Sequence, residues 1–128
     1  MNAKGLMLED WVRIPSGQVC KVKTLNTDGT VGVGVGATDL MGFDARLLSP
    51  VALTAELLEA NGFEQTVDDV HYSDGETEVR FYGSRGEEVE VTFENLEGRE
   101  FHGEFAAEVH RLQNLWNNAE MEREFRMA

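Results

Sequence analysis

The chain has 128 residues, of which 41% are hydrophobic, so it is long enough to bury a core of its own. Its single cysteine excludes an internal disulfide framework and any zinc or iron–sulfur site built from several cysteines. No segment reaches the roughly 18 apolar residues of a membrane span, and the start "MNAKGLMLEDW" lacks the apolar region of a secretory signal, so we expect a cytoplasmic protein.

The net charge of −13 is confined to the second part of the chain. Residues 1–50 contain five basic and five acidic residues, whereas residues 51–128 contain 6 basic and 19 acidic residues. Such an excess of carboxylates repels phosphate backbones and anionic lipid, so we expect no direct binding to nucleic acid or to a membrane. A basic partner, or solubility alone, accounts for the charge.

The first 50 residues predict a small β-barrel subdomain. "DWVRI" predicts a strand closed by the turn "PSG", and "QVCKVKTL" predicts a second strand. An Asp28-Gly29 turn leads into a third strand, "TVGVGV", and "FDARLL" predicts a fourth. Short strands joined by tight turns predict a small, partly open, SH3-like barrel.

Two features of these strands resemble reactive sites but are better explained by packing. Gly32, Gly34 and Gly36 alternate with valines, which places the glycines on one face of a strand and matches no phosphate-binding loop. Cys20 shares a strand face with Val22 and is expected to be a small buried hydrophobe. If the "TVGVGV" strand were a free sheet edge, it could pair with a second copy of the chain, so a homodimer is a further prediction.

The segment "LTAELLEANGF" predicts a helix of two turns. Thr54 is a favourable N-cap, Glu56 lies in the first turn, and Asn61-Gly62 ends the helix, with Phe63 available for an apolar contact beyond it. Leu57 and Leu58 give this helix an apolar side.

Three segments resemble a family of small proteins encoded by phages and prophages of gut bacteria. Residues 50–63 match the pattern P-x-x-L-T-x-E-x-L-E-x-N-G-F, residues 109–116 match V-H-x-L-Q-N-L-aromatic, and the opening "DWVRI" is also similar. Together they cover about a fifth of the chain, in the order of the family. The end, "NNAEMEREFRMA", departs from the pattern because it lacks a glycine between helix and final strand. The resemblance implies a mobile-element origin and a shared fold, and it supplies no catalytic residue.

Residues 66–93 return to a period of two. "TVDDVHYS", "ETEVRFY" and "EEVEVTF" are separated by Asp74-Gly75 and by "GSRG", which predicts a three-stranded antiparallel meander. Valines and phenylalanines alternate with glutamates along the last of these strands, so one face packs and the other is acidic.

The last part of the chain predicts a helix that covers the apolar face of the meander. Phe105, Val109, Leu112 and Trp116 have the spacing of one helical stripe. Residues 121–127 alternate between apolar and charged, which favours a closing strand, as the family resemblance also implies. We therefore predict an α+β fold with a β-barrel subdomain over residues 1–50 and an acidic α+β subdomain over 51–128, forming one compact unit.

Candidate partner-binding residues lie on this second helix and among the aromatics. His110, Gln113 and Asn117 form a polar row beside the apolar stripe, which is either a recognition strip or an ordinary helix flank. Trp11, Tyr72 and Tyr82 are candidate aromatic anchors of an interface, of which we favour Trp11 and Tyr82.

The segment "DDVHYSDGE" combines carboxylates with a histidine, a composition that can bind a divalent metal. It does not fit a calcium loop, because with Gly75 in the glycine position two required acidic sites fall on Val70 and Tyr72. We expect no metal site and no cofactor.

Three functions from different classes remain. The first is a non-enzymatic module that binds a host or phage protein. The second is an acidic decoy that imitates DNA and occupies a nucleic-acid-binding host protein. The third is a small metal-dependent hydrolase that would use His71, His102 or His110. We favour the first, so we expect a protein that is not an enzyme and has no catalytic residues.

Overall fold

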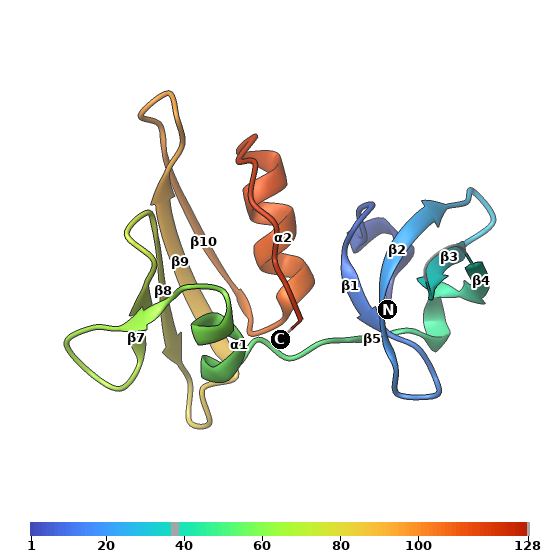
Figure 1. Cartoon of the computed structure of the whole chain (residues 1–128), viewed down its shortest axis with the longest axis horizontal. Coiled ribbons are helices and arrows are strands. Elements are labelled where there is room, and N and C mark those ends of the chain that lie inside the picture. The colour runs from blue at the N-terminus through green and yellow to red at the C-terminus, as the bar shows by residue number, and fades with distance from the viewer. Residues whose placement is uncertain (37–38, 128) are drawn as a thin grey trace. The chain divides into compact units, whose positions relative to one another are not determined.

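The computed structural model describes residues 1–36 and 39–127, which form mostly β structure (Figure 1). The chain divides into two compact units, Met1–Val51 and Ala52–Ala128, and each contains one antiparallel five-stranded sheet. Helices accompany the second sheet, so the predicted α+β class is confirmed. None of the helices within the described residues has the length and apolar character of a membrane span.

The first unit is an open sheet with the strand order β4-β3-β2-β1-β5. Its strands are β1 (Trp11–Arg13), β2 (Val19–Leu25), β3 (Thr30–Val35), β4 (Asp39–Asp44) and β5 (Ser49–Pro50). Single 3-10 turns, η1 (Ala3–Gly5) and η2 (Ala45–Leu47), precede β1 and β5. Over the described residues neither sheet closes into a barrel, so the predicted SH3-like barrel is not confirmed.

One strand prediction for this unit is wrong, and the condition that we set for a homodimer is not met. The fourth strand lies earlier than "FDARLL", because the Asp44 side chain accepts a hydrogen bond from the backbone N–H of Arg46, 3.0 Å away, and starts η2 where we expected strand. The "TVGVGV" strand is not a free edge, because β3 pairs with both β2 and β4. Both sides of β3 are therefore already paired, and a second copy of the chain could not pair with this strand in the way that we considered.

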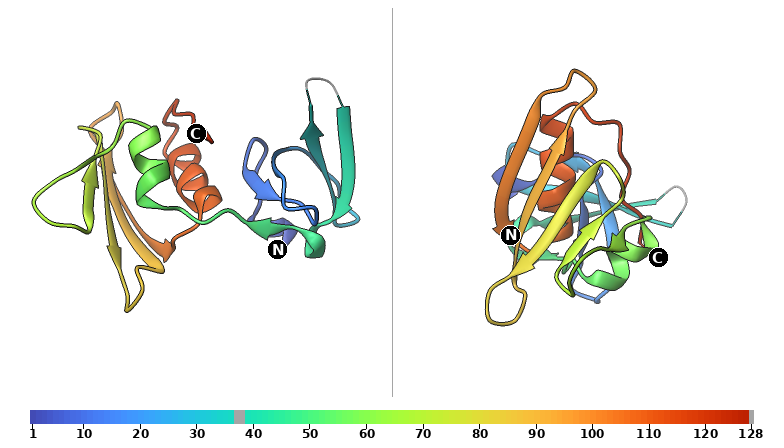
Figure 2. Two further views of the ribbon diagram at one scale, coloured as in Figure 1. Left: turned by 60° about the horizontal axis from the view of Figure 1, so that its bottom comes forward. Right: turned by 90° about the vertical axis from the view of Figure 1, so that its left-hand side faces the viewer.

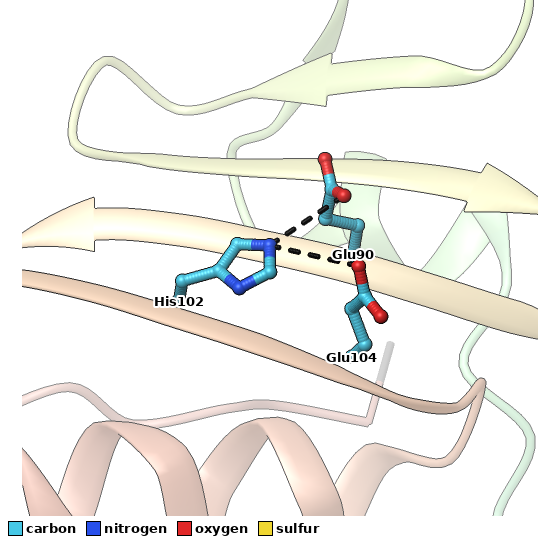
Figure 3. Close-up of side chains that lie close together, drawn as sticks. All are labelled: Glu90, His102 and Glu104. Carbon is cyan, nitrogen blue, oxygen red and sulfur yellow. Dashed lines mark ion pairs between the residues drawn. The ribbon is translucent and has the colours of Figure 1, made fainter.

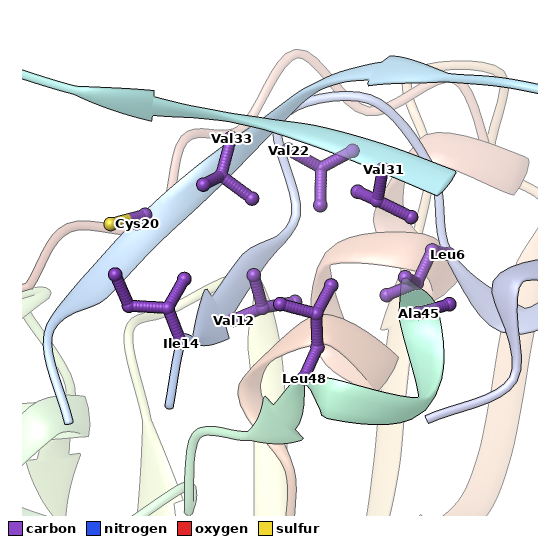
Figure 4. Packing of buried hydrophobic residues seen from close by; sticks show 9 residues of the cluster. All are labelled: Leu6, Val12, Ile14, Cys20, Val22, Val31, Val33, Ala45 and Leu48. Carbon is purple, nitrogen blue, oxygen red and sulfur yellow. The ribbon is translucent and has the colours of Figure 1, made fainter. Parts of the chain in front are cut away.

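The alternating valines of β3 point into the core of this unit, as predicted (Figure 4). Val31 and Val33 are fully buried, and Cys20 is 2% exposed among them. Burial raises the pKa of the Cys20 thiol, which fits a packing role. A Cβ on Gly32 would overlap Oγ1 of Thr24 on β2. The absence of a side chain at Gly32 therefore leaves room for the Thr24 side chain.

The second unit is a five-stranded meander with the order β10-β9-β8-β7-β6, and α2 lies against one of its faces (Figure 2). Its elements are α1 (Ala55–Ala60), β6 (Glu64–Gln65), β7 (His71–Ser73), β8 (Thr77–Tyr82), β9 (Glu88–Glu94), β10 (Glu100–Ala106) and α2 (Val109–Asn118). The indole N–H of Trp116 on α2 donates to Oγ1 of Thr77 on β8 at 3.2 Å, which joins the helix to the sheet.

The signals around α1 are confirmed. Oγ1 of Thr54 accepts the N–H of Leu57 at 3.2 Å, which makes Thr54 the N-cap. Gly62 has a φ of +87°, the left-handed conformation that ends a helix, and the next N–H, of Phe63, bonds back to the carbonyl of Leu58 at 3.0 Å. Phe63 is 2% exposed, so its ring is buried just beyond the helix end.

The predicted meander is too short and the predicted helix too long. Residues 100–106 form β10, an additional strand, so Phe105 belongs to the sheet and α2 begins only at Val109. The sheet has five strands where we expected three.

The predicted closing strand over residues 121–127 does not form. Two apolar side chains of this segment are nevertheless buried, as the alternation predicts. They are Met121 and Phe125, and the Phe125 ring centre lies 6.5 Å from that of Trp116. In place of a strand partner, the Asn61 side chain bonds both backbone groups of Arg126, accepting its N–H at 2.8 Å and donating to its carbonyl at 2.9 Å.

Candidate functional site

One face of the second sheet carries most of the charged side chains of its long strands. Alternation along β8, β9 and β10 buries Val79, Val89 and Val91 on the side of α2 and exposes the opposite side. The residues that face solvent there, which we name the acidic face, are Glu78, Arg80, Tyr82, Glu88, Glu90, Thr92, Glu94, Glu100, His102 and Glu104. The face therefore has six carboxylates and one arginine.

The strand register places carboxylates directly opposite one another on this face. Glu90 lies opposite Glu104, and Glu94 lies opposite Glu100. Like charges in directly opposed positions destabilise a sheet. Arg80 lies opposite Glu90 on the other side, with its Nη2 3.5 Å from Oε2 of Glu90, and offsets part of this repulsion.

Glu90, His102 and Glu104 converge at the centre of the acidic face, and we name them the Glu90 cluster (Figure 3). Nε2 of His102 lies 3.5 Å from Oε2 of Glu90 and 3.9 Å from Oε1 of Glu104. The hydrogen bond from Arg80, followed by that from His102, lowers the pKa of Glu90, so this carboxylate is charged at neutral pH.

A second feature of the acidic face is a hollow of about 260 Å³ beside the cluster. The residues that line it are Ser73, Gly75, Glu76, Glu78, Thr92, Phe93, Glu94 and Glu100. Four of them are glutamates and none is basic. Arg123 pairs with Glu76 at 3.3 Å, so Glu78, Glu94 and Glu100 are the carboxylates that suit the hollow to a cationic head group.

Tyr82, a predicted anchor, stands at one end of the acidic face. Its side chain is half-buried, and the Arg80 guanidinium lies 5.1 Å from the ring centre. Desolvation raises the pKa of Tyr82, and the charges of Glu88 and Glu104 raise it further. Trp11, the other predicted anchor, is half-buried in β1 of the first unit, with Lys21 Nζ 5.1 Å from its ring centre.

The polar row of α2 does not lie on one exposed surface. His110 is only 5% exposed and burial lowers its pKa, Gln113 is half-buried, and Asn117 is exposed. A recognition strip built on this row would therefore lack its histidine.

The carboxylates of residues 68–76 do not form one site. Asp68 accepts from Nδ1 of His71 at 2.7 Å, whereas Asp74 and Glu76 pair with Arg123. Within the described residues, the Glu90 cluster is the one group in which three potential metal ligands meet.

The sequence analysis considered His102 only as one of three histidines of a metal-dependent hydrolase and did not select Glu90 or Glu104. The cluster depends on the pairing of β9 with β10, and β10 was not predicted. The turn "NLEG" at residues 95–98 is the signal that would have revealed it, because the side chain of Asn95 accepts the N–H groups of Glu97 and Arg99 and Gly98 has a φ of +79°.

Comparisons with protein-family models, with curated proteins and with solved structures gave no match to this chain. The function proposed below is therefore argued from geometry and charge.

Proposed function

We propose that the chain is a non-enzymatic protein-binding module that presents its acidic face to a basic surface of a partner protein. The acidic hollow supports this most directly, because four glutamates line it without a basic residue among them. A lysine or arginine side chain of the partner would enter the hollow, and the surrounding carboxylates would steer the approach of the partner.

The family resemblance supports a more specific proposal. It suggests a phage or prophage accessory protein that acts in the cytoplasm of a bacterial host, on a host or phage protein. Five short strands, with a 3-10 turn before the last, also support an opened SH3-like fold for the first unit.

An acidic decoy is the second candidate function, and the spacing of the carboxylates favours it. Residues two apart on a strand lie about 6.8 Å from each other on one face. Glu88 and Glu90 on β9 have this spacing, and Glu104 on β10 lies directly opposite Glu90, so the three carboxylates form a small regular array. In this reading the partner is a protein that normally binds nucleic acid.

The experiment uses the whole chain as bait for the proteins of a bacterial lysate, at low and at moderate salt. Captured proteins are identified, purified and measured directly for affinity. We compare the wild type with a hollow variant, Glu78→Gln/Glu94→Gln/Glu100→Gln. The control variant, Glu59→Gln/Glu97→Gln/Glu122→Gln, removes the same number of charges from exposed positions outside the acidic face.

We expect a basic partner whose binding weakens with salt and is about tenfold weaker for the hollow variant, from three contacts of roughly 0.5 kcal/mol each. The control variant should bind like the wild type. Equal binding by all three proteins would refute docking through the acidic face. Displacement of the partner by double-stranded DNA would identify the decoy function, and its absence would favour the general binding module.

A further inference from the structure

We propose that the Glu90 cluster is a binding site for a divalent transition-metal ion, with Zn²⁺ as the representative ion. The cluster offers one imidazole nitrogen and two carboxylate oxygens. This is a ligand set that zinc accepts, with water completing the coordination. The proposal does not depend on the protein-binding function.

The distances within the cluster are close to those of an assembled site. Bonds of about 2.0–2.2 Å in a tetrahedral arrangement place ligand atoms about 3.3–3.6 Å apart. Nε2 of His102 already lies 3.5 Å from Glu90 and 3.9 Å from Glu104, and all three ligand atoms lie within 4.8 Å of one another. Small side-chain rotations complete the geometry, with no change of the backbone.

The backbone positions of the ligands are set by regular sheet structure. His102 and Glu104 are two residues apart on β10 and so share a face, and Glu90 lies directly across from Glu104 on β9. On the opposite face of the same two strands, three positions along from the pair of Glu90 and Glu104, the rings of Phe93 and Phe101 stack with their centres 5.4 Å apart. Ligands on such a rigid support lose little freedom when the ion binds.

The opposed pair of Glu90 and Glu104 also gives the ion an electrostatic role. The two carboxylates repel each other across the strands when no cation lies between them. A divalent ion replaces this repulsion with two attractive contacts. Binding of the ion therefore also stabilises the pairing of β9 with β10.

Arg80 opposes binding and so tunes the affinity. Its Nη2 lies 3.5 Å from the same Glu90 oxygen that faces His102. Its guanidinium also lies over the ring of Tyr82, which provides an alternative contact when the ion binds Glu90. Replacement of Arg80 by a neutral residue should therefore strengthen metal binding.

The test is calorimetric titration of the metal-free chain with Zn²⁺ at moderate salt. We expect one ion per chain, with affinity at least about tenfold weaker in His102→Ala and in Glu104→Gln, because each loses a ligand. Arg80→Gln should bind several-fold more tightly. On addition of zinc, the ring signals of His102 in an NMR spectrum should shift more than those of His71.

Two control variants separate this site from general attraction to an acidic protein. Glu94→Gln/Glu100→Gln removes an opposed carboxylate pair from the same two strands, and His71→Ala removes the histidine beside Asp68. Both should bind Zn²⁺ like the wild type. Absence of saturable binding, or equal losses in His71→Ala and His102→Ala, would overturn the proposal. Stronger binding of Ca²⁺ than of Zn²⁺ would overturn the assignment to a transition metal.

Zinc binding and protein binding can fail separately. The hollow variant retains Glu90, His102 and Glu104, so it should bind the protein partner more weakly, as stated above, and bind Zn²⁺ like the wild type. His102→Ala retains the hollow and should show the opposite behaviour.

Discussion

Asp74 is a single side chain that joins distant parts of the second unit. Its carboxylate accepts the N–H groups of Glu76 at 2.9 Å and Thr77 at 2.8 Å, and it pairs with Arg123 from the C-terminal segment. Burial acts most strongly on its pKa and raises it, but the two N–H groups and Arg123 together outweigh burial and bring the pKa below the ordinary 3.8. The Arg123 guanidinium also lies 4.7 Å from the ring centre of Trp116.

Replacement of Arg123 by alanine should lower the free energy of unfolding at neutral pH by about 1–3 kcal/mol, because a carboxylate that is only 8% exposed loses its cation. Folding favours the charged form of Asp74, since its pKa is lower in the folded state. This stabilisation is complete above the ordinary pKa and disappears as the pH falls through the folded value.

Urea unfolding of Arg123→Ala and the wild type at neutral pH and at about pH 3 checks this linkage. The difference between the two proteins should shrink in acid, and the contact with Trp116 should account for what remains. Arg126→Ala is the control, because the two hydrogen bonds between Arg126 and Asn61 use only the backbone of Arg126. An equal loss in both variants would contradict a specific role for Arg123.

β10 shows which elements the sequence could and could not predict. The α1 caps, the hairpin turns and the alternating strands β2, β3, β8 and β9 follow local rules, and the structure confirms them. β10 was missed because Phe105 fits two patterns. It has helical spacing to Val109, which we followed, and it also has the strand alternation with Phe101. Gly103 weakened the strand pattern, since it occupies an inward position where a Cβ would lie 3.1 Å from Leu115.

The Glu90 cluster could not be predicted for the same reason. Glu90 and His102 are neighbours only through the register of β9 and β10, and no local pattern connects them. The closing strand failed differently. Alternation predicted which side chains of residues 121–127 are buried, but it could not show that the backbone of Arg126 bonds to the Asn61 side chain and not to a neighbouring strand.

The opposed carboxylates of β9 and β10 also give a prediction for this pair of strands. Glu104→Lys places a cation directly opposite Glu90, and His102 is the one basic residue beside it on β10. The substitution should therefore raise the free energy of unfolding by about 0.5 kcal/mol. Urea midpoints at low salt measure the gain, which should shrink at high salt because screening weakens exposed ion pairs.

Glu97→Lys is the matched control for this change. It alters the net charge equally at an exposed position in the β9–β10 turn, away from the opposed pair. If Glu97→Lys stabilises the chain as much as Glu104→Lys, the effect belongs to net charge and not to the strand register. If the expected difference appears, the native sequence retains a destabilising pair, which is typical of residues kept for binding.

At the scale of the whole molecule, the two units differ sharply in charge. The first unit has five basic and five acidic residues, whereas the second unit, residues 52–128, has 6 basic and 19 acidic residues and so carries the full −13. Repulsion among like charges destabilises a compact state, and salt screens it over roughly 10 Å at 0.1 M. Salt should therefore act on the second unit and leave the first nearly unchanged.

We expect added sodium chloride to raise the unfolding temperature of the second unit by a few degrees between low and physiological ionic strength. Hydrogen exchange provides the internal control, because amides of β9 and β10 should become better protected while those of β2 and β3 change little. A fall in stability with salt would show that ion pairs such as Arg123–Asp74 outweigh the general repulsion. In that case salt would weaken both the fold and the binding of a basic partner. The proposed acidic face requires opposite responses. Salt should stabilise the sheet that carries the carboxylates, and it should weaken the attraction of those carboxylates for a basic partner.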